Sequence, residues 1–173
     1  MKILIAYFSR EWSNYVGESL KNLKEGNTEV AAKMIQKLSG GELFRIATVS
    51  GYPPDYEETT RVAQKEQRQN ARPGLAGRVA GMEAYDLVIL GYPNWWGTMP
   101  MAVFTFLEAY DLSGKTILPF CTHEGSGMGH SEGDIKKLCP RSTLLKGLAI
   151  RGSGVHGAEK ELAAWLMAAK VIG

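Results

Sequence analysis

The residues best suited to bind a small molecule fall in three short segments, of which the first is interrupted. Ser9 and Arg10 follow an apolar run, and Gly26, Asn27 and Thr28 stand at the start of a predicted helix. Hydroxyls, a guanidinium and the free N–H groups of a helix N-terminus together suit a phosphate. The pattern GxxxxGK followed by Ser or Thr is absent, which excludes an NTPase loop. Taken alone, Asn27 or Thr28 is more simply explained as a helix N-cap.

A pair of adjacent tryptophans marks the second segment, which reads Pro93-Asn94-Trp95-Trp96-Gly97-Thr98. Two indoles directed at one crevice would make a wall for a flat aromatic ligand. The alternative is that one indole packs in the core while the other lies at the surface.

Glycine is frequent in the third segment, which reads Thr122-His123-Glu124-Gly125-Ser126-Gly127-Met128-Gly129. Backbone without side chains can approach a ligand closely, although an ordinary flexible loop has the same composition. The segment is not GxGxxG and follows a late apolar run, so it is not the dinucleotide-binding fingerprint. Together, the three segments suit one ligand with a phosphate at one end and a flat ring at the other.

Short apolar runs alternate with helical patterns and would position these segments. The runs have strand length and little polar alternation, which is typical of strands buried on both faces; they cover residues 3–8, 43–46, 87–92, 116–121 and, on either side of Gly147, 144–150. Helical spacing follows each run, over residues 28–38, 57–70, 103–110, 135–138 and 162–169, and Pro100 suits the first turn of the third helix. This order predicts a doubly wound α/β sheet. In such sheets, ligands bind at the carboxyl ends of the strands, where the three segments would converge.

Composition narrows the class of protein further. The 173 residues suit a single domain over 1–173, and the formal charge of +2 is too small to argue for nucleic acid. The two cysteines form no disulfide framework and fit a reducing compartment, so we expect a cytoplasmic protein. No apolar run reaches the roughly 20 residues of a membrane helix. The histidines and cysteines have no metal-binding spacing, and no metal is predicted.

At these segments the sequence resembles the flavodoxin-like family of FMN-binding proteins, through the pieces IAYFSR, GNTEVAAKMI, YDLVILGYPNWWGTMP and PFCTHEGSGMG. The resemblance implies a three-layer sandwich whose five-stranded parallel sheet has the order 2-1-3-4-5, with FMN at its carboxyl edge. It implies that the phosphate is held by Ser9, Arg10, Asn27 and Thr28. It implies that the isoalloxazine is framed by Pro93, Asn94, Trp95, Trp96 and Gly97, and closed on the other side by Thr122, His123, Glu124, Gly125, Ser126 and Gly127.

Two further expectations follow from the resemblance. Gly97 would let a peptide reorient toward the flavin N5, and Trp95 or Trp96 would stack on the ring and stabilise its oxidised form most. The family's phosphate loop is interrupted here by fifteen residues, Glu11 to Glu25, which carry Trp12 and Tyr15. This insertion either folds over the flavin or is a surface excursion without a role.

The resemblance leaves two roles open, an enzyme that reduces quinones or similar small acceptors with NAD(P)H, and a one-electron carrier between protein partners. Carriers of this family are usually strongly acidic, so a charge of +2 favours the enzyme. A basic cluster could meet a nucleotide phosphate, although a solvated helix face is the commoner explanation; it comprises Arg61, Lys65, Arg68, Arg72 and Arg78. A binding module that has lost the flavin is the third alternative, and both a monomer and a homodimer are compatible with the sequence.

Other enzyme classes do not fit the sequence. A phosphorylation-controlled receiver domain needs an acidic cluster where Phe8, Ser9 and Arg10 stand. No G-x-S-x-G elbow is present for a hydrolase. Gly127 stands where a cysteine phosphatase built on Cys121 would need arginine.

Overall fold

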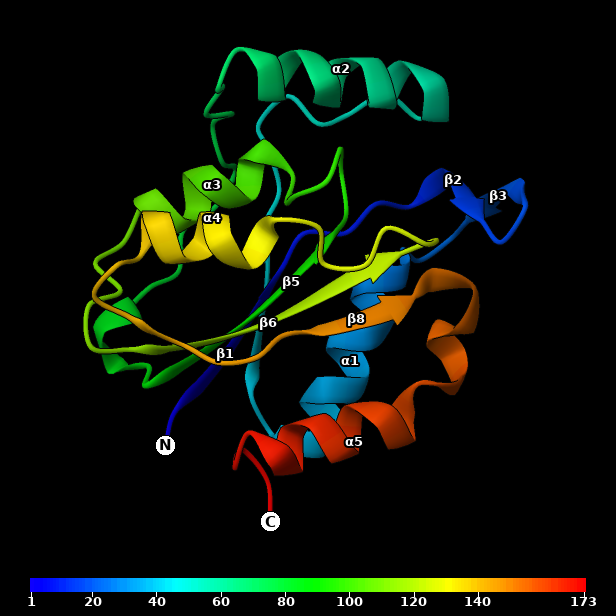
Figure 1. The fold of residues 1–173 in the computed structure, drawn as a ribbon. Helices are drawn as coiled ribbons and strands as arrows, with labels where there is room; N and C mark the ends of the chain where they lie inside the picture. Colours follow the sequence, from blue (N-terminus) through cyan, green and yellow to red (C-terminus); the bar gives the residue numbers. More distant parts are fainter.

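A parallel sheet forms the middle layer of the computed structural model, which describes residues 1–173 (Figure 1). Its strands lie in the order β4-β1-β5-β6, and the last place is shared by β7 and β8, which both pair with β6. The predicted order 2-1-3-4-5 is confirmed. The strands are β1 (Ile3–Tyr7), β4 (Glu42–Arg45), β5 (Leu87–Pro93), β6 (Thr116–His123), β7 (Thr143–Leu144) and β8 (Leu148–Arg151).

The fifth predicted strand is broken in two at Gly147. The N–H group of Gly147 donates to Glu132 Oε1 at 2.7 Å, so the chain leaves the ladder there. A Cβ at this position would overlap the terminal methyl of Met128. The break therefore accommodates the helix that packs across it.

Helices cover both faces of the sheet, as the unbroken apolar runs predicted. One face carries α1 (Asn27–Ser39) and α5 (Glu159–Ala168), and the other carries α3 (Met101–Glu108) and α4 (Ser131–Leu138) (Figure 1). Alternate residues of β1 divide between the two cores: Ile3 and Ile5 face α1, while Leu4 and Ala6 face α3. Pro100 is the N-cap of α3 rather than a residue of its first turn. Short 3-10 turns, η1 (Met82–Ala84) and η2 (Gly152–Gly157), complete the chain.

Two elements stand apart from these layers. The insertion after β1 forms an antiparallel hairpin of β2 (Trp12–Val16) and β3 (Ser19–Leu23), which the sequence did not predict. The predicted polar helix over 57–70 is present as α2 (Tyr56–Arg68), and it lies above α3 instead of on the sheet (Figure 1). We call the hairpin and α2 together the roof. None of the helices is long and apolar enough to cross a membrane.

Candidate functional site

A cleft of about 510 Å³ lies at the carboxyl edge of the sheet, under the roof. All three segments singled out in the sequence contribute to its walls. Of their predicted site residues, the cleft is lined by Arg10, Asn27, Thr28, Pro93, Asn94, Trp95, Trp96, Gly97, Thr122, His123, Glu124 and Ser126. The predicted residues Ser9, Gly125 and Gly127 do not line it.

The first wall of the cleft is the N-terminus of α1. Ser9, two residues after β1, accepts the N–H group of Glu29 on its Oγ at 3.0 Å and so caps the helix instead of lining the cleft. Gly26 precedes the helix because a Cβ there would overlap Ser9 Oγ and the Arg10 carbonyl. The hydroxyls of Thr28 and Thr122 are bonded at 2.8 Å, which joins this wall to the end of β6. The first N–H groups of a helix have no intrahelical acceptor, which suits the start of α1 to an anion.

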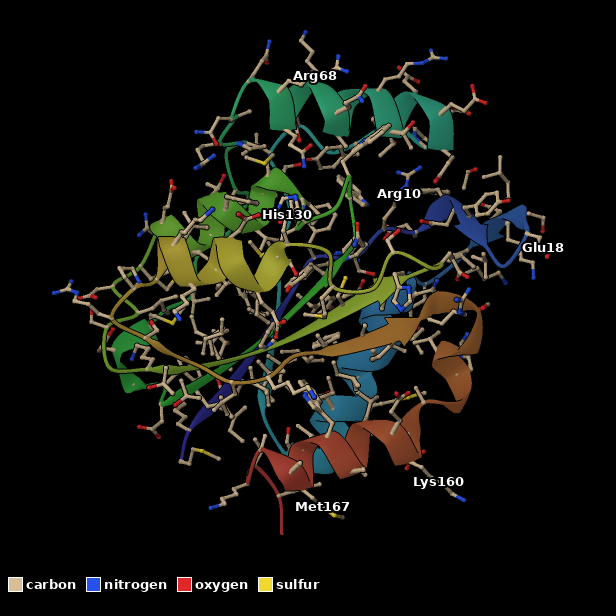
Figure 2. All side chains as sticks on the ribbon, viewed as in Figure 1. Arg10, Glu18, Arg68, His130, Lys160 and Met167 are labelled. Carbon is tan, nitrogen blue, oxygen red and sulfur yellow. The ribbon has the colours of Figure 1, made fainter.

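Arg10 binds the hairpin and the loop that leads into α2, and Figure 2 shows it below α2 and beside the hairpin. Its Nη1 donates to the Pro53 carbonyl at 2.8 Å, and its Nη2 donates to the carbonyls of Pro54 at 2.9 Å and Ser13 at 3.1 Å. Burial lowers the pKa of Arg10, but a guanidinium remains charged in proteins. Its Nε is buried without a hydrogen-bond partner. The Nε–H group of Arg10 is therefore free to bind a ligand.

The second wall is a tight turn after β5. Trp95 and Thr98 exchange backbone hydrogen bonds of 2.8 and 3.3 Å, and the two residues between them, Trp96 and Gly97, have φ of +54° and +86°. Positive φ at both central positions identifies a type I′ turn. Trp96 is thus held in a conformation that favours glycine, and this is a strained position in the cleft wall.

Side-chain amides hold the central peptide of this turn at both ends. Gln67 Nε2, from α2, donates to the Trp96 carbonyl at 3.1 Å. The Gly97 N–H group donates to Asn94 Oδ1 at 3.0 Å, and Asn94 Nδ2 donates to the Gly127 carbonyl at 2.9 Å. Asn94 therefore fixes the loops after β5 and β6 relative to each other. Gly127 acts through this contact and not as a lining residue.

The two tryptophans differ in environment although both line the cleft. Trp95 packs edge-on against Phe8 and Tyr52, with ring centroids 5.1 Å away in each case. Trp96 is 49% exposed, and its Nε1 donates to the Thr60 carbonyl in α2 at 2.9 Å. One indole thus belongs to the core and the other to the surface, and together they form an aromatic wall.

The loop after β6 forms the third wall. His123 Nδ1 accepts the Gly125 N–H group at 2.8 Å, so the neutral ring carries its proton on Nε2. Burial and the nearby Arg151 lower the pKa of His123, which favours this neutral form. Glu124 Oε1 accepts the Ser153 N–H group at 2.6 Å, whereas its Oε2 is buried without a partner.

Six lining residues were not predicted as site residues, and all belong to the roof: Asn14, Tyr15, Tyr56, Thr59, Thr60 and Ala63. The four on α2 have the spacing i, i+3, i+4 and i+7, which identifies one helix face. That spacing was visible in the sequence, but its small and polar side chains did not mark a buried surface. Tyr15 lies in the cleft wall, so the insertion folds over the cleft; Trp12 does not line it.

The basic cluster does not line the cleft. Arg72 binds Glu108 through Nε and Nη2, each at 2.9 Å, and Arg78 lies over the ring of Tyr110. Arg61, Lys65 and Arg68 are exposed on α2, and Figure 2 shows Arg68 on the outer side of that helix. Only Arg61, Lys65 and Arg68 therefore form a solvated helix face, because Arg72 and Arg78 lie after α2.

Comparison with known proteins settles the family. The sequence matches the family model described as Flavodoxin over residues 2–169. The chain belongs to the flavodoxin family. A crystal structure from Bacteroides eggerthii, classed among the flavoproteins, is 31% identical, with 96% of each chain covered and a TM-score of 0.79. A second one, from Bacteroides uniformis, is 25% identical over 96% of this chain and 97% of that one, with a TM-score of 0.76.

A Lactobacillus acidophilus flavoprotein in complex with FMN shares the flavodoxin fold at 21% identity, with a TM-score of 0.64 over 90% of this chain and 97% of that one. None of the curated protein sequences matches the chain. The resemblance carried by the three segments is therefore confirmed at the level of family and fold.

Proposed function

We propose that the chain binds FMN in the cleft and acts as an oxidoreductase that reduces quinones or similar small acceptors with NAD(P)H. The observation that carries the proposal is the convergence, in one cleft, of the α1 N-terminus and the Trp95–Trp96 wall. An anion site and an aromatic wall in a single cleft match a ligand with a phosphate and a flat ring. The family match supports the same cofactor.

Two buried polar atoms in the cleft walls fit the chemistry of FMN. Arg10 Nε is a charged donor without an acceptor, and a phosphate oxygen would satisfy it. Glu124 Oε2 is an acceptor without a donor, and FMN offers ribityl hydroxyls and a ring N–H group. Because an unpaired buried polar group is costly, each atom favours a ligand that supplies its partner.

Under this proposal, the backbone amides of Asn27 and Thr28 bind the phosphate, and Ser9 fixes the helix end that presents them. Trp95 and Trp96 bind the ring by stacking and exclude water from one side. Asn94 orients the Trp96–Gly97 peptide, and His123 presents its Nε2 proton to the cleft. Bound FMN supplies the redox chemistry, and the protein tunes it through stacking, hydrogen bonds and nearby charge.

The overall reaction is NAD(P)H plus H⁺ plus quinone to NAD(P)⁺ plus hydroquinone. We favour it over a carrier function because the formal charge is +2 and because the tryptophan-lined cleft opens to solvent at Trp96, which is 49% exposed. A carrier that docks to a basic partner would be expected to have an acidic face around its cofactor.

The test is a visible spectrum of the purified protein, followed by NAD(P)H oxidation with and without a quinone. The expected results are flavin absorption, release of FMN on denaturation, and quinone-dependent oxidation of NAD(P)H. Flavin without turnover would assign the carrier function. Protein that contains no flavin and takes up no FMN would contradict the proposal and favour a flavin-free binding module.

A further inference from the structure

The inner face of α2 is unusual for a helix. A helix that packs on a core presents large aliphatic side chains there, whereas α2 presents Tyr56, Thr59, Thr60 and Ala63 to the cleft. The helix makes no core of its own, because only Thr59 and Ala63 are buried. Its small inward residues leave space under the roof instead of filling it.

Two phenol rings stand at the junction of the hairpin and α2. The ring centroids of Tyr15 and Tyr56 are 6.2 Å apart, with the planes inclined by 36°. Both residues line the cleft, and neither hydroxyl has a hydrogen-bond partner within the protein. Such a pair offers flat surfaces for stacking and two O–H groups that can donate to a ligand.

Arg10 is the only arginine or lysine that lines the cleft, and under the proposed function its free Nε–H group binds the FMN phosphate. The terminal nitrogens of Arg10 are all engaged by backbone carbonyls. Lys65 and Arg68 follow the inward residues Thr60 and Ala63 by five positions, which places them roughly 140° around the helix from the inner face. A phosphate or another anionic group would therefore not increase the affinity of a ligand that contacts the two tyrosines.

We propose that the space bounded by Tyr15, Tyr56 and Thr60 is the acceptor subsite, and that it takes a flat, uncharged aromatic carbonyl compound of the quinone class. The phenol hydroxyls donate to the carbonyl oxygens of the oxidised acceptor and accept from the hydroxyls of the reduced one. The inference rests on the proposed function, because it assigns the acceptor to a place beside the cofactor.

The experiment measures the binding of 2-methyl-1,4-naphthoquinone to the oxidised, FMN-loaded protein, after the FMN affinity of each variant has been measured separately. Tyr15→Ala and Tyr56→Ala are each expected to raise the quinone Kd about tenfold, because each removes an aromatic contact and one donor. The FMN Kd is expected to stay unchanged. Tyr15→Phe and Tyr56→Phe keep the rings and are expected to show a smaller increase.

Matched controls come from the same two elements. Leu20 lies opposite Tyr15 in the hairpin register and is 53% exposed, and Lys65 lies on the outer face of α2. Neither residue lines the cleft, so Leu20→Ala and Lys65→Ala should leave the quinone Kd as in the wild type. The charged probe 1,4-naphthoquinone-2-sulfonate should bind more weakly than the uncharged quinone.

The possible outcomes separate this inference from the proposed function. FMN uptake with a quinone Kd that neither tyrosine variant changes would overturn the subsite and leave the cofactor proposal standing. Equal or tighter binding of the sulfonate would overturn the chemical class. Failure of the wild type to take up FMN would overturn both. If an alanine variant does not fold, its phenylalanine counterpart and the KM for the quinone, measured against kcat, decide the same question.

Discussion

The carboxyl edge of the sheet and the roof border the same cleft, but different interactions hold them in place. Behind the edge lie strand residues such as Ile5, Ile89 and Leu118, which are completely buried between two helical layers. In the roof, only Val16, Thr59 and Ala63 are buried. Apolar burial fixes the edge, since it is the dominant favourable contribution to folding.

The roof is held instead by hydrogen bonds that side chains donate, most of them to backbone carbonyls. Arg10 binds three carbonyls, Gln67 and the Thr60 carbonyl bind Trp96, and Tyr52 donates to Glu66 in α2 at 2.8 Å. A two-stranded hairpin is marginally stable by itself. The sheet edge of the cleft is therefore rigid, whereas the roof is the part that can open locally.

Two glycine substitutions test most strongly whether the sheet edge and the roof differ in rigidity. At Gly26, on the edge, a Cβ would overlap Ser9 Oγ and the Arg10 carbonyl, so Gly26→Ala should cost roughly 2–3 kcal/mol of global stability through overpacking. At Gly17, in the hairpin turn, φ is +67° and nothing lies within 4 Å of a Cβ. Gly17→Ala should cost about 1 kcal/mol of local strain. Urea unfolding measures both, and equal losses would contradict the contrast.

Removal of the Arg10 guanidinium tests what holds the roof. Arg10→Met leaves three carbonyls without their charged donor, so amides of residues 13–23 and 56–68 should exchange roughly tenfold to hundredfold faster. Amides of β1 and β5 should exchange as in the wild type. Hydrogen exchange resolved by residue checks this. Uniform acceleration through the sheet would show that Arg10 supports the whole fold and not the roof.

Gly97→Ala tests the role of the Trp95–Thr98 turn, which joins the sheet edge to the roof. Its φ of +86° makes alanine cost about 1–2 kcal/mol, and the added Cβ would lie 3.3 Å from His130 Nε2. The reduction potentials of the bound flavin should shift, because the Trp96–Gly97 peptide belongs to the proposed site of the ring. Gly114→Ala is the matched control, since Gly114 has φ of +76° and does not line the cleft. Potentials that are equal in the two variants would contradict a role for the turn.

The smallest expected effect concerns pH. The pKa of His123 is lowered by burial and by Arg151 and raised in part by Glu124, so the folded state binds fewer protons than the unfolded state just below the ordinary value of ~6.5. Stability should therefore fall as the pH drops through that window and be fully present above it. His123→Gln should flatten this part of the profile. Denaturation curves between pH ~5 and ~7.5 measure it, and an unchanged profile would contradict the assignment.

The fold could be predicted from the sequence because its signals are local. Runs such as 87–92 and 117–121 are apolar throughout, and strands covered on both faces require that pattern. The same runs place the segments that begin at Ser9, Pro93 and Thr122 at one edge. Their convergence in the cleft follows from parallel strand direction alone.

The helix of the roof was predicted, but the hairpin and the placement of both elements over the cleft were not, because the contacts that hold them are long-range. Nothing near Arg10 in the sequence indicates that it binds the carbonyls of Pro53 and Pro54. The inner face of α2 has regular helical spacing, but Tyr56, Thr59 and Ala63 do not form an apolar stripe. Ser9 illustrates a related limit, since its residue type suits phosphate binding while its position makes it a helix cap.

The central claim, that FMN occupies the edge of the cleft, is tested most directly through the four tryptophan indole N–H groups. In a two-dimensional NMR titration of the apoprotein with FMN, the signals of Trp95 and Trp96 should shift and saturate at one FMN per chain. Trp165, which donates to the Lys146 carbonyl on the α5 side of the sheet, should not move. A shift of Trp165 without Trp95 and Trp96, or no shift at all, would contradict the account.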